Sequence, residues 1–204
     1  VLDLAENTLV VLSSHNGTTH LKQEVDYDFF NSVGELRGLK GSLYEGGIRV
    51  PTIVRWPGHV APGTASDRVS GFEDWLPTIL DVIGSSEATP GGVDGISLLP
   101  TLLGESQEPR PLLYREFSGY GGQQSVRVGD WKAIRTNVDR GNVDIQLYDL
   151  AKDPGERQDV AHQHREVVAN LERLMQREHI QSEHYPLRPF DAPPKPPRKR
   201  QNAQ

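Results

Sequence analysis

Two segments near the N-terminus, the second of them rich in glycine, hold the side chains best suited to chemistry. One runs Ser13-Ser-His-Asn-Gly-Thr-Thr-His20, and the other runs from Leu36 to Pro51 with Lys40 inside it. Lys40 lies between Gly38 and Gly41, and small neighbours let the backbone and an ammonium group approach one anionic ligand together. The sequence therefore predicts an anion-binding lysine, with an ordinary surface lysine as the alternative.

Polar side chains in these segments suit further tasks. The amide oxygen of Asn16 is a donor that hard cations such as calcium prefer, although Asn16 followed by Gly17 is also a common turn sequence. His20 could donate a hydrogen bond to an anion or act as an acid, and a solvated histidine is the alternative. Glu45 and Arg49 can pair across two glycines, which favours an architectural role for both.

Two strands are expected to hold these segments in place. Residues 8–13 form a short apolar run that predicts a buried strand, and residues 50–56 predict a second strand that stops at Pro57-Gly58. The intervening residues 18–47 have few periodic apolar positions, so they predict a long ordered loop with one helical turn near residues 28–31.

Helical and strand patterns continue along the rest of the chain. Residues 73–84 place apolar side chains at helical spacing before Gly84, which predicts a core-facing helix. A small antiparallel sheet is predicted by three later strand-like runs: residues 112–117, 125–136 and 144–150. Periodic apolar residues at 167–175 predict a helix over one face of that sheet. Asp153-Pro-Gly-Glu156 carries helix-start signals that could also serve only a turn.

Composition argues against several classes of function. With a net charge of -6, the chain lacks the basic surface of a nucleic-acid-binding protein. Having no cysteine, it has no disulfide and no thiolate metal site. No apolar stretch is long enough to cross a bilayer, so no membrane partner is expected. The chain begins at Val1 rather than Met, which suggests a cut through a longer protein. The oligomeric state is left open.

Taken in order, five segments closely resemble the type I sulfatase family of the alkaline-phosphatase-like superfamily. They are Ser14-His-Asn-Gly17, Lys40-Gly-Ser-Leu-Tyr-Glu-Gly-Gly47, Arg49 to Gly58, Asp74 to Leu80 and Leu147 to Glu156. The resemblance implies an α/β fold, in which the C-terminal part of an alkaline-phosphatase-like mixed sheet with flanking helices precedes a small antiparallel-sheet-and-helix subdomain.

This fold divides the chain into three expected parts. Residues 1–104 correspond to the C-terminal part of a sulfatase catalytic domain, and residues 105–190 to the small α+β subdomain. Residues 191–204 are rich in proline and basic residues, a composition that predicts a disordered tail.

The resemblance also implies a chemistry. In this family a formylglycine, made from Cys or Ser in a Cys/Ser-x-Pro-x-Arg motif, attacks the sulfate ester, while calcium and cationic side chains hold the sulfate. Lys40 corresponds to a sulfate-binding lysine that also steadies the leaving oxygen, and His20 to a candidate substrate contact. The chain contains no such motif. The formylglycine is therefore expected in an N-terminal part that precedes it, and the chain alone is expected to be inactive.

His15 departs from the family pattern. It stands where the family has a metal-binding aspartate, next to Asn16 at the position of a metal-binding amide. An imidazole suits calcium poorly, so the resemblance implies a Ca2+ site weakened by His15. A weakened or inactive relative, a metal that accepts nitrogen, and an accident of sequence all stay open.

Sulfate ester hydrolysis is thus the leading hypothesis, with a sulfated small molecule or glycan as the partner. The family implies a periplasmic, secreted or lysosomal location. Two alternatives remain: a phosphoryl or phosphonate hydrolase of the same superfamily, and a non-catalytic sulfatase-like remnant that binds a glycan or a protein. Tyr120, Gln123 and Gln124 are candidates for a loop that sets substrate specificity.

Overall fold

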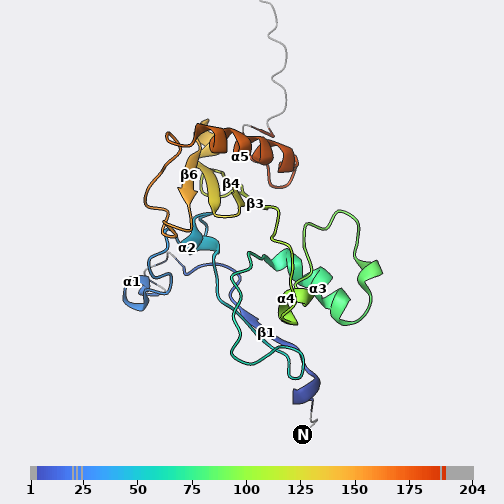
Figure 1. The fold of residues 1–204 in the computed structure, drawn as a ribbon. Coiled ribbons are helices and arrows are strands. Elements are labelled where there is room, and N and C mark those ends of the chain that lie inside the picture. Colours follow the sequence, from blue (N-terminus) through green and yellow to red (C-terminus); the bar gives the residue numbers. More distant parts are fainter. Residues whose placement is uncertain (1–3, 20, 22, 24, 189, 192–204) are drawn as a thin grey trace, which may run out of the picture.

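The computed structural model describes residues 4–19, 21, 23, 25–188 and 190–191. Its elements form two regions, which Figure 1 shows toward opposite ends of the molecule. A four-stranded sheet and the long helix α5 (Arg165–Glu178) make up one region, and a two-stranded ribbon with short helices makes up the other. The predicted α/β fold is confirmed, with both sheets antiparallel.

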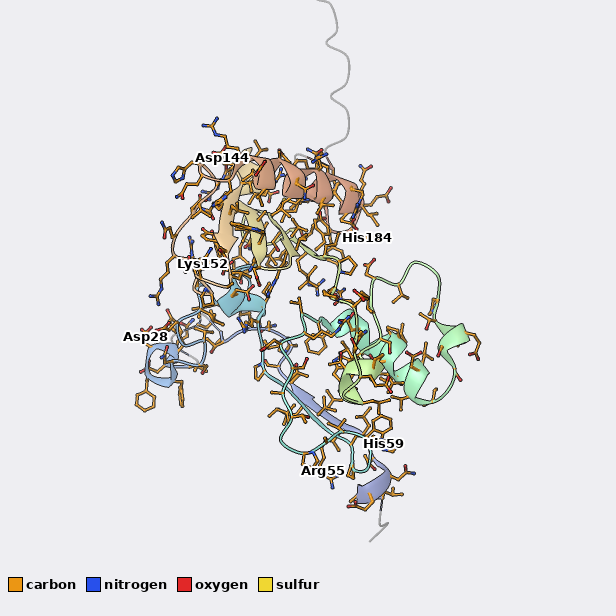
Figure 2. All side chains as sticks on the ribbon, viewed as in Figure 1. Asp28, Arg55, His59, Asp144, Lys152 and His184 are labelled. Carbon is orange, nitrogen blue, oxygen red and sulfur yellow. The ribbon has the colours of Figure 1, made fainter. Side chains whose placement is uncertain are left out.

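The ribbon pairs β1 (Val10–Ser13) with β2 (Thr52–Arg55), so that Val10 lies opposite Arg55. Figure 2 marks the far end of this ribbon with Arg55 and His59. The first strand was expected to be buried, yet Leu12 on β1 is 59% exposed, and Ile53 on its partner β2 is 62% exposed. That expectation is wrong for this structure, because little of the described chain packs against either face of the ribbon.

Short helices lie before and between the two strands in the sequence: η1 (Ala5–Asn7), α1 (Tyr27–Phe30) and α2 (Glu45–Ile48). The side chain of Asp26 caps α1 by accepting the backbone N–H of Phe29 at 3.0 Å. Asn31 ends α1 in the left-handed conformation, with φ of 44°. The helical turn predicted near residues 28–31 is therefore confirmed with a shift of one residue.

A second group of helices comprises η2 (Phe72–Asp74), α3 (Trp75–Val82), η3 (Ser86–Ala88) and α4 (Leu99–Leu102). The predicted helix over residues 73–84 is confirmed, but only part of it faces a core. Thr78 is fully buried and its hydroxyl accepts the N–H of Leu98 at 2.8 Å, whereas Leu76 and Ile79 are 47% and 49% exposed. The apolar side of α3 is therefore only partly covered by the described residues.

The larger sheet is a meander of four strands in the order β3 (Leu113–Phe117), β4 (Gln123–Val128), β5 (Trp131–Thr136) and β6 (Gln146–Asp149). The run at residues 125–136, interpreted as one strand, is in fact split between β4 and β5. The chain reverses at Gly129, whose φ of 56° suits a glycine in a tight turn. A short helix, η4 (Val138–Arg140), follows β5.

Helix α5 covers one face of this sheet, as the periodicity predicts (Figure 1). Leu171 and Met175 pack against three fully buried sheet residues: Val126, Ala133 and Leu147. The Asp153-Pro-Gly-Glu156 segment forms a turn rather than a helix, and the Asp153 carboxylate accepts the N–H groups of Arg157 and Gln158 at 2.7 and 2.8 Å. This region carries the better-closed core.

Two expectations concern the chain's surroundings. Within the described ranges, no helix combines the length and apolar character that crossing a bilayer requires. The tail predicted at residues 191–204 lies outside the described residues, apart from Asp191.

Candidate functional site

The structure brings the segment of residues 13–20 and the glycine-rich segment of residues 36–51 together through their backbones. Gly17 donates its N–H to the carbonyl of Gly47 at 2.9 Å, and Lys40 donates its N–H to the carbonyl of Thr18 at 2.8 Å. The loop that follows β1 therefore lies directly against the turn that carries Lys40. The sequence predicted both segments as functional, and their contact is a finding of the structure.

Glycine is required at this contact because the backbones approach too closely for a side chain. A Cβ added to Gly17 would lie 1.9 Å from the carbonyl oxygen of Gly46. A Cβ on Gly46 would lie 2.3 Å from the oxygen of Gly38, and one on Gly47 would lie 2.1 Å from the oxygen of Ser42. Each glycine thus permits a close approach that alanine would block.

Lys40 lies at the exposed surface of this glycine-lined turn. Its neighbours Gly38 and Gly41 have φ of 85° and 87°, a conformation that side chains other than glycine rarely adopt. Among the described residues, no ion pair occupies the Lys40 ammonium. The backbone is fixed while the charged end faces solvent, an arrangement suited to receiving an anion.

The residues considered for metal binding do not form a metal site by themselves. His15 is exposed, Asn16 is partly exposed, and the Ser14 hydroxyl donates to the Asn16 carbonyl at 2.8 Å. No group of three or more His, Asp or Glu residues in the described ranges could hold a metal ion. Calcium takes about six to eight oxygen ligands, so these donors are too few to form a calcium site by themselves. His20 lies outside the described residues.

A buried cluster of charged side chains connects the segment that carries Lys40 to the larger sheet. The Lys132 ammonium lies 2.8 Å from Glu45 Oε1 and 2.9 Å from Glu156 Oε1. The Glu156 carboxylate also accepts the backbone N–H of Glu45 at 2.5 Å. All three side chains are at least 95% buried. This cluster joins α2, on the lysine segment, to β5 of the larger sheet.

Burial raises the pKa of Glu156, and the Lys132 ammonium partly offsets that rise. Glu156 also has φ of 51°, a left-handed conformation that is uncommon for a residue other than glycine. The expected pair of Glu45 and Arg49 is present but loose, with a separation of 3.9 Å and a half-exposed arginine. Glu45 is therefore architectural, and Lys132 is its principal partner.

Arg37 extends the same support toward the edge of the sheet. Its guanidinium donates to the Tyr148 hydroxyl at 2.9 Å and to the Glu156 carbonyl at 3.0 Å, and it lies 4.0 Å from the centre of the Tyr44 ring. Burial is the main cause that raises the pKa of Tyr148 to about 12. Sequence reasoning missed this network, for which the lysine between Trp131 and Ala133 was the available signal.

The three candidate specificity residues face in different directions. Gln123 is buried, and its side chain joins β4 to the lysine segment. It donates to the Gly41 carbonyl at 2.8 Å and accepts from the Leu43 N–H at 3.1 Å. Gln124 is buried and donates hydrogen bonds to Tyr114 and Glu116 on the neighbouring strand β3. Tyr120, in contrast, is 66% exposed. Only Tyr120 remains placed to meet a ligand from solvent.

Comparison with known proteins gives a consistent result. Residues 38–181 match the family model described as N-sulphoglucosamine sulphohydrolase, C-terminal. Human arylsulfatase A (Homo sapiens) is 33% identical over 76% of this chain and 34% of its own length. An N-acetylgalactosamine-6-O-sulfatase of Bacteroides thetaiotaomicron is 32% identical over 86% of this chain and 37% of its own length. The chain thus spans little more than a third of these relatives.

Solved structures agree with the sequence matches. A protein from a Bacteroides thetaiotaomicron locus for glycosaminoglycan metabolism superposes with a TM-score of 0.70 at 31% identity, covering 86% of this chain and 39% of that protein. The protein Ps i-CgsB, in complex with k-i-k-neocarrahexaose, has a TM-score of 0.67 at 28% identity and covers 85% of this chain and 36% of that protein.

Proposed function

We propose that this chain, which belongs to the type I sulfatase family, forms the C-terminal portion of an enzyme that hydrolyses sulfate esters. The observation that supports this most is the seating of the Lys40 turn against the loop after β1 by two backbone hydrogen bonds. A fixed backbone beside an exposed ammonium provides charge stabilisation without reorganisation during the reaction.

In this proposal Lys40 binds an oxygen of the sulfate group and steadies the oxygen that leaves when the ester S–O bond breaks. His20 is proposed as a second substrate contact. The family generally uses formylglycine and Ca2+, which supply a nucleophile and a charge that holds the sulfate. The nucleophile would come from a part of the protein outside this sequence, since the chain holds no Cys/Ser-x-Pro-x-Arg motif.

No step is assigned to calcium within this chain, because its described donors are too few to form a calcium site by themselves. Asn16 and His15 remain proposed as partial contributors to a metal site that other residues would have to complete. The imidazole of His15 would make that site weaker than an aspartate would.

The proposed substrate class is a sulfated glycan. Support comes from the complex of Ps i-CgsB with k-i-k-neocarrahexaose and from the N-acetylgalactosamine-6-O-sulfatase among the relatives. Small aryl sulfates are the competing class, because arylsulfatase A is similar to an equal degree. A periplasmic, secreted or lysosomal location is proposed on the same family grounds.

The test uses the longest natural protein that contains this sequence, assayed with sulfate esters of an N-acetylhexosamine and of a phenol, and with the matched phosphate esters. Lys40→Ala should lower sulfate ester turnover by about 10²- to 10³-fold, as expected for removing one charge-stabilising donor. Lys152→Ala is the control, since Lys152 is an 83% exposed lysine in the turn after β6 (Figure 2).

Three outcomes would decide between the hypotheses. Equal activity of the Lys40 and Lys152 variants would show that Lys40 is ordinary loop surface. Turnover of phosphate esters alone would favour the phosphoryl hydrolase. A folded wild-type protein that turns over neither class would contradict the enzymatic proposal and favour the non-catalytic remnant.

A further inference from the structure

The turn between β3 and β4 reaches back onto the lysine segment. A Cβ added to Gly41 would lie 2.5 Å from Cε2 and 3.0 Å from Cδ2 of the Tyr120 ring. The aromatic ring therefore lies directly over Gly41, the residue that follows Lys40 in the chain. The ring and the proposed sulfate-binding lysine thus come from segments that are far apart in the sequence.

The backbone of this turn is shaped to hold Tyr120 in place. Tyr120 has φ of 53°, a left-handed conformation that is disfavoured for a bulky side chain. The next two residues, Gly121 and Gly122, have φ of 88° and 75°. Such conformations persist where the surroundings determine them strongly, and they gather at functional sites.

Contacts on both sides of the turn determine its position. The buried side chain of Gln123 bonds to the carbonyl of Gly41 and to the N–H of Leu43, at 2.8 and 3.1 Å. The Phe117 ring lies 5.9 Å from the Tyr120 ring at an interplanar angle of 41°. A Cβ on Gly119 would lie 2.7 Å from the Phe117 ring, so Gly119 lets the turn close over that ring.

The Tyr120 ring is nevertheless 66% exposed. On the strands of the same sheet, Tyr148 is 1% exposed and Tyr114 is only partly exposed. A tyrosine that is held firmly and still presents most of its surface is unusual for a residue whose only task is packing. It is well suited to a ligand that offers an apolar face and polar groups at its rim.

We propose that Tyr120 is a specificity-determining residue, whose ring forms a platform for the sugar that carries the sulfate bound at Lys40. This inference rests on the proposed function. A pyranose ring has a face of C–H groups that stacks on an aromatic face, while its hydroxyl groups remain in water or meet the tyrosine hydroxyl. Because the platform contacts the sugar and not the sulfur, it acts mainly on substrate binding.

The test compares Tyr120→Ala, Tyr120→Phe and the control Tyr185→Ala, since Tyr185 is 77% exposed and lies outside the turn. In the longest natural protein with this sequence, Tyr120→Ala should raise KM for a 6-sulfated N-acetylhexosamine about tenfold, as the loss of an aromatic contact predicts. KM for a small alkyl sulfate, which has no ring to stack on Tyr120, should rise less, and kcat should change less than KM. Tyr120→Phe, which keeps the ring, should restore binding of the sugar.

The outcomes separate this inference from the proposed function. If the wild type is active and Tyr120→Ala leaves KM unchanged, the inference is wrong while the proposed function stands. The same holds if Tyr120→Ala raises KM equally for both substrates. If the wild type has no turnover, titration of the same sulfated sugar followed by NMR decides. Binding that Tyr120→Ala abolishes and Tyr120→Phe keeps supports the platform without hydrolysis, whereas absence of binding overturns both. Tyr120→Leu, which keeps apolar bulk without an aromatic face, serves if the alanine variant unfolds.

Discussion

The four-stranded sheet and the β1–β2 ribbon differ in how they bury their apolar side chains. In the sheet, Val126, Ala133 and Leu147 are inaccessible to solvent beneath α5. In the ribbon, Leu12 and Ile53 are 59% and 62% exposed. The sheet region carries its own core, while the ribbon presents apolar faces that the described chain leaves uncovered. We infer that the ribbon gains its remaining packing from further polypeptide, consistent with a chain spanning about a third of its relatives.

The largest effect is expected from removing the charge that joins the two regions. Lys132→Met should destabilise the chain by about 3–5 kcal/mol, because it leaves two buried carboxylates without their cation. Glu45 and Glu156 are 5% and 0% exposed, so water cannot replace the ammonium. Urea unfolding followed by circular dichroism measures the change. Lys152→Met, at an exposed lysine, should leave the unfolding midpoint near that of the wild type, and equal losses in the two variants would contradict this account.

A second experiment compares leucines from the two regions. Leu171→Ala should cost about 2–5 kcal/mol of stability, because it empties a space in a closed core. Leu12→Ala should change stability by less than about 0.5 kcal/mol in this chain, since the side chain is already exposed. In the longest natural protein the cost of Leu12→Ala should increase as further residues cover the ribbon. A Leu12 variant that is equally mild in both proteins would show that the ribbon stays exposed.

The smallest expected effect concerns the loop at the end of β1. His15→Asp should raise calcium affinity in the longest natural protein, because a carboxylate replaces an imidazole that suits the ion poorly. Isothermal titration calorimetry with calcium measures this change. His59→Asp, at an exposed site stacked beside Trp56, is the matched control. Unchanged affinity after His15→Asp would mean that this position does not reach the metal.

Local patterns in the sequence predicted most of the elements. Periodicity identified α5 and the glycines marked the two segments that meet at Lys40, because both signals arise from neighbouring residues. The expected division at residues 104 and 105 stays a prediction. The split between β4 and β5 was missed although Gly129-Asp130 is a turn signal, since a long β-rich run masked it.

Contacts between distant residues were beyond prediction from one sequence. Lys132 and Glu45 are 87 positions apart, so no local pattern connects them. The exposure of β1 also could not be predicted, because an apolar run indicates that a strand needs cover and not which residues supply it. The roles of Lys40, Asn16, His15 and His20 remain proposals, and His20 lies outside the described residues.

The bonds between Gly17 and Gly47 and between Lys40 and Thr18 use only main-chain atoms. A loop held in this way keeps its path whichever side chain projects from the position after Ser14. During evolution, the residue at position 15 is thus free to change from carboxylate to imidazole while the neighbouring lysine stays where it is. The backbone that positions Lys40 therefore does not depend on which metal ligand stands at position 15.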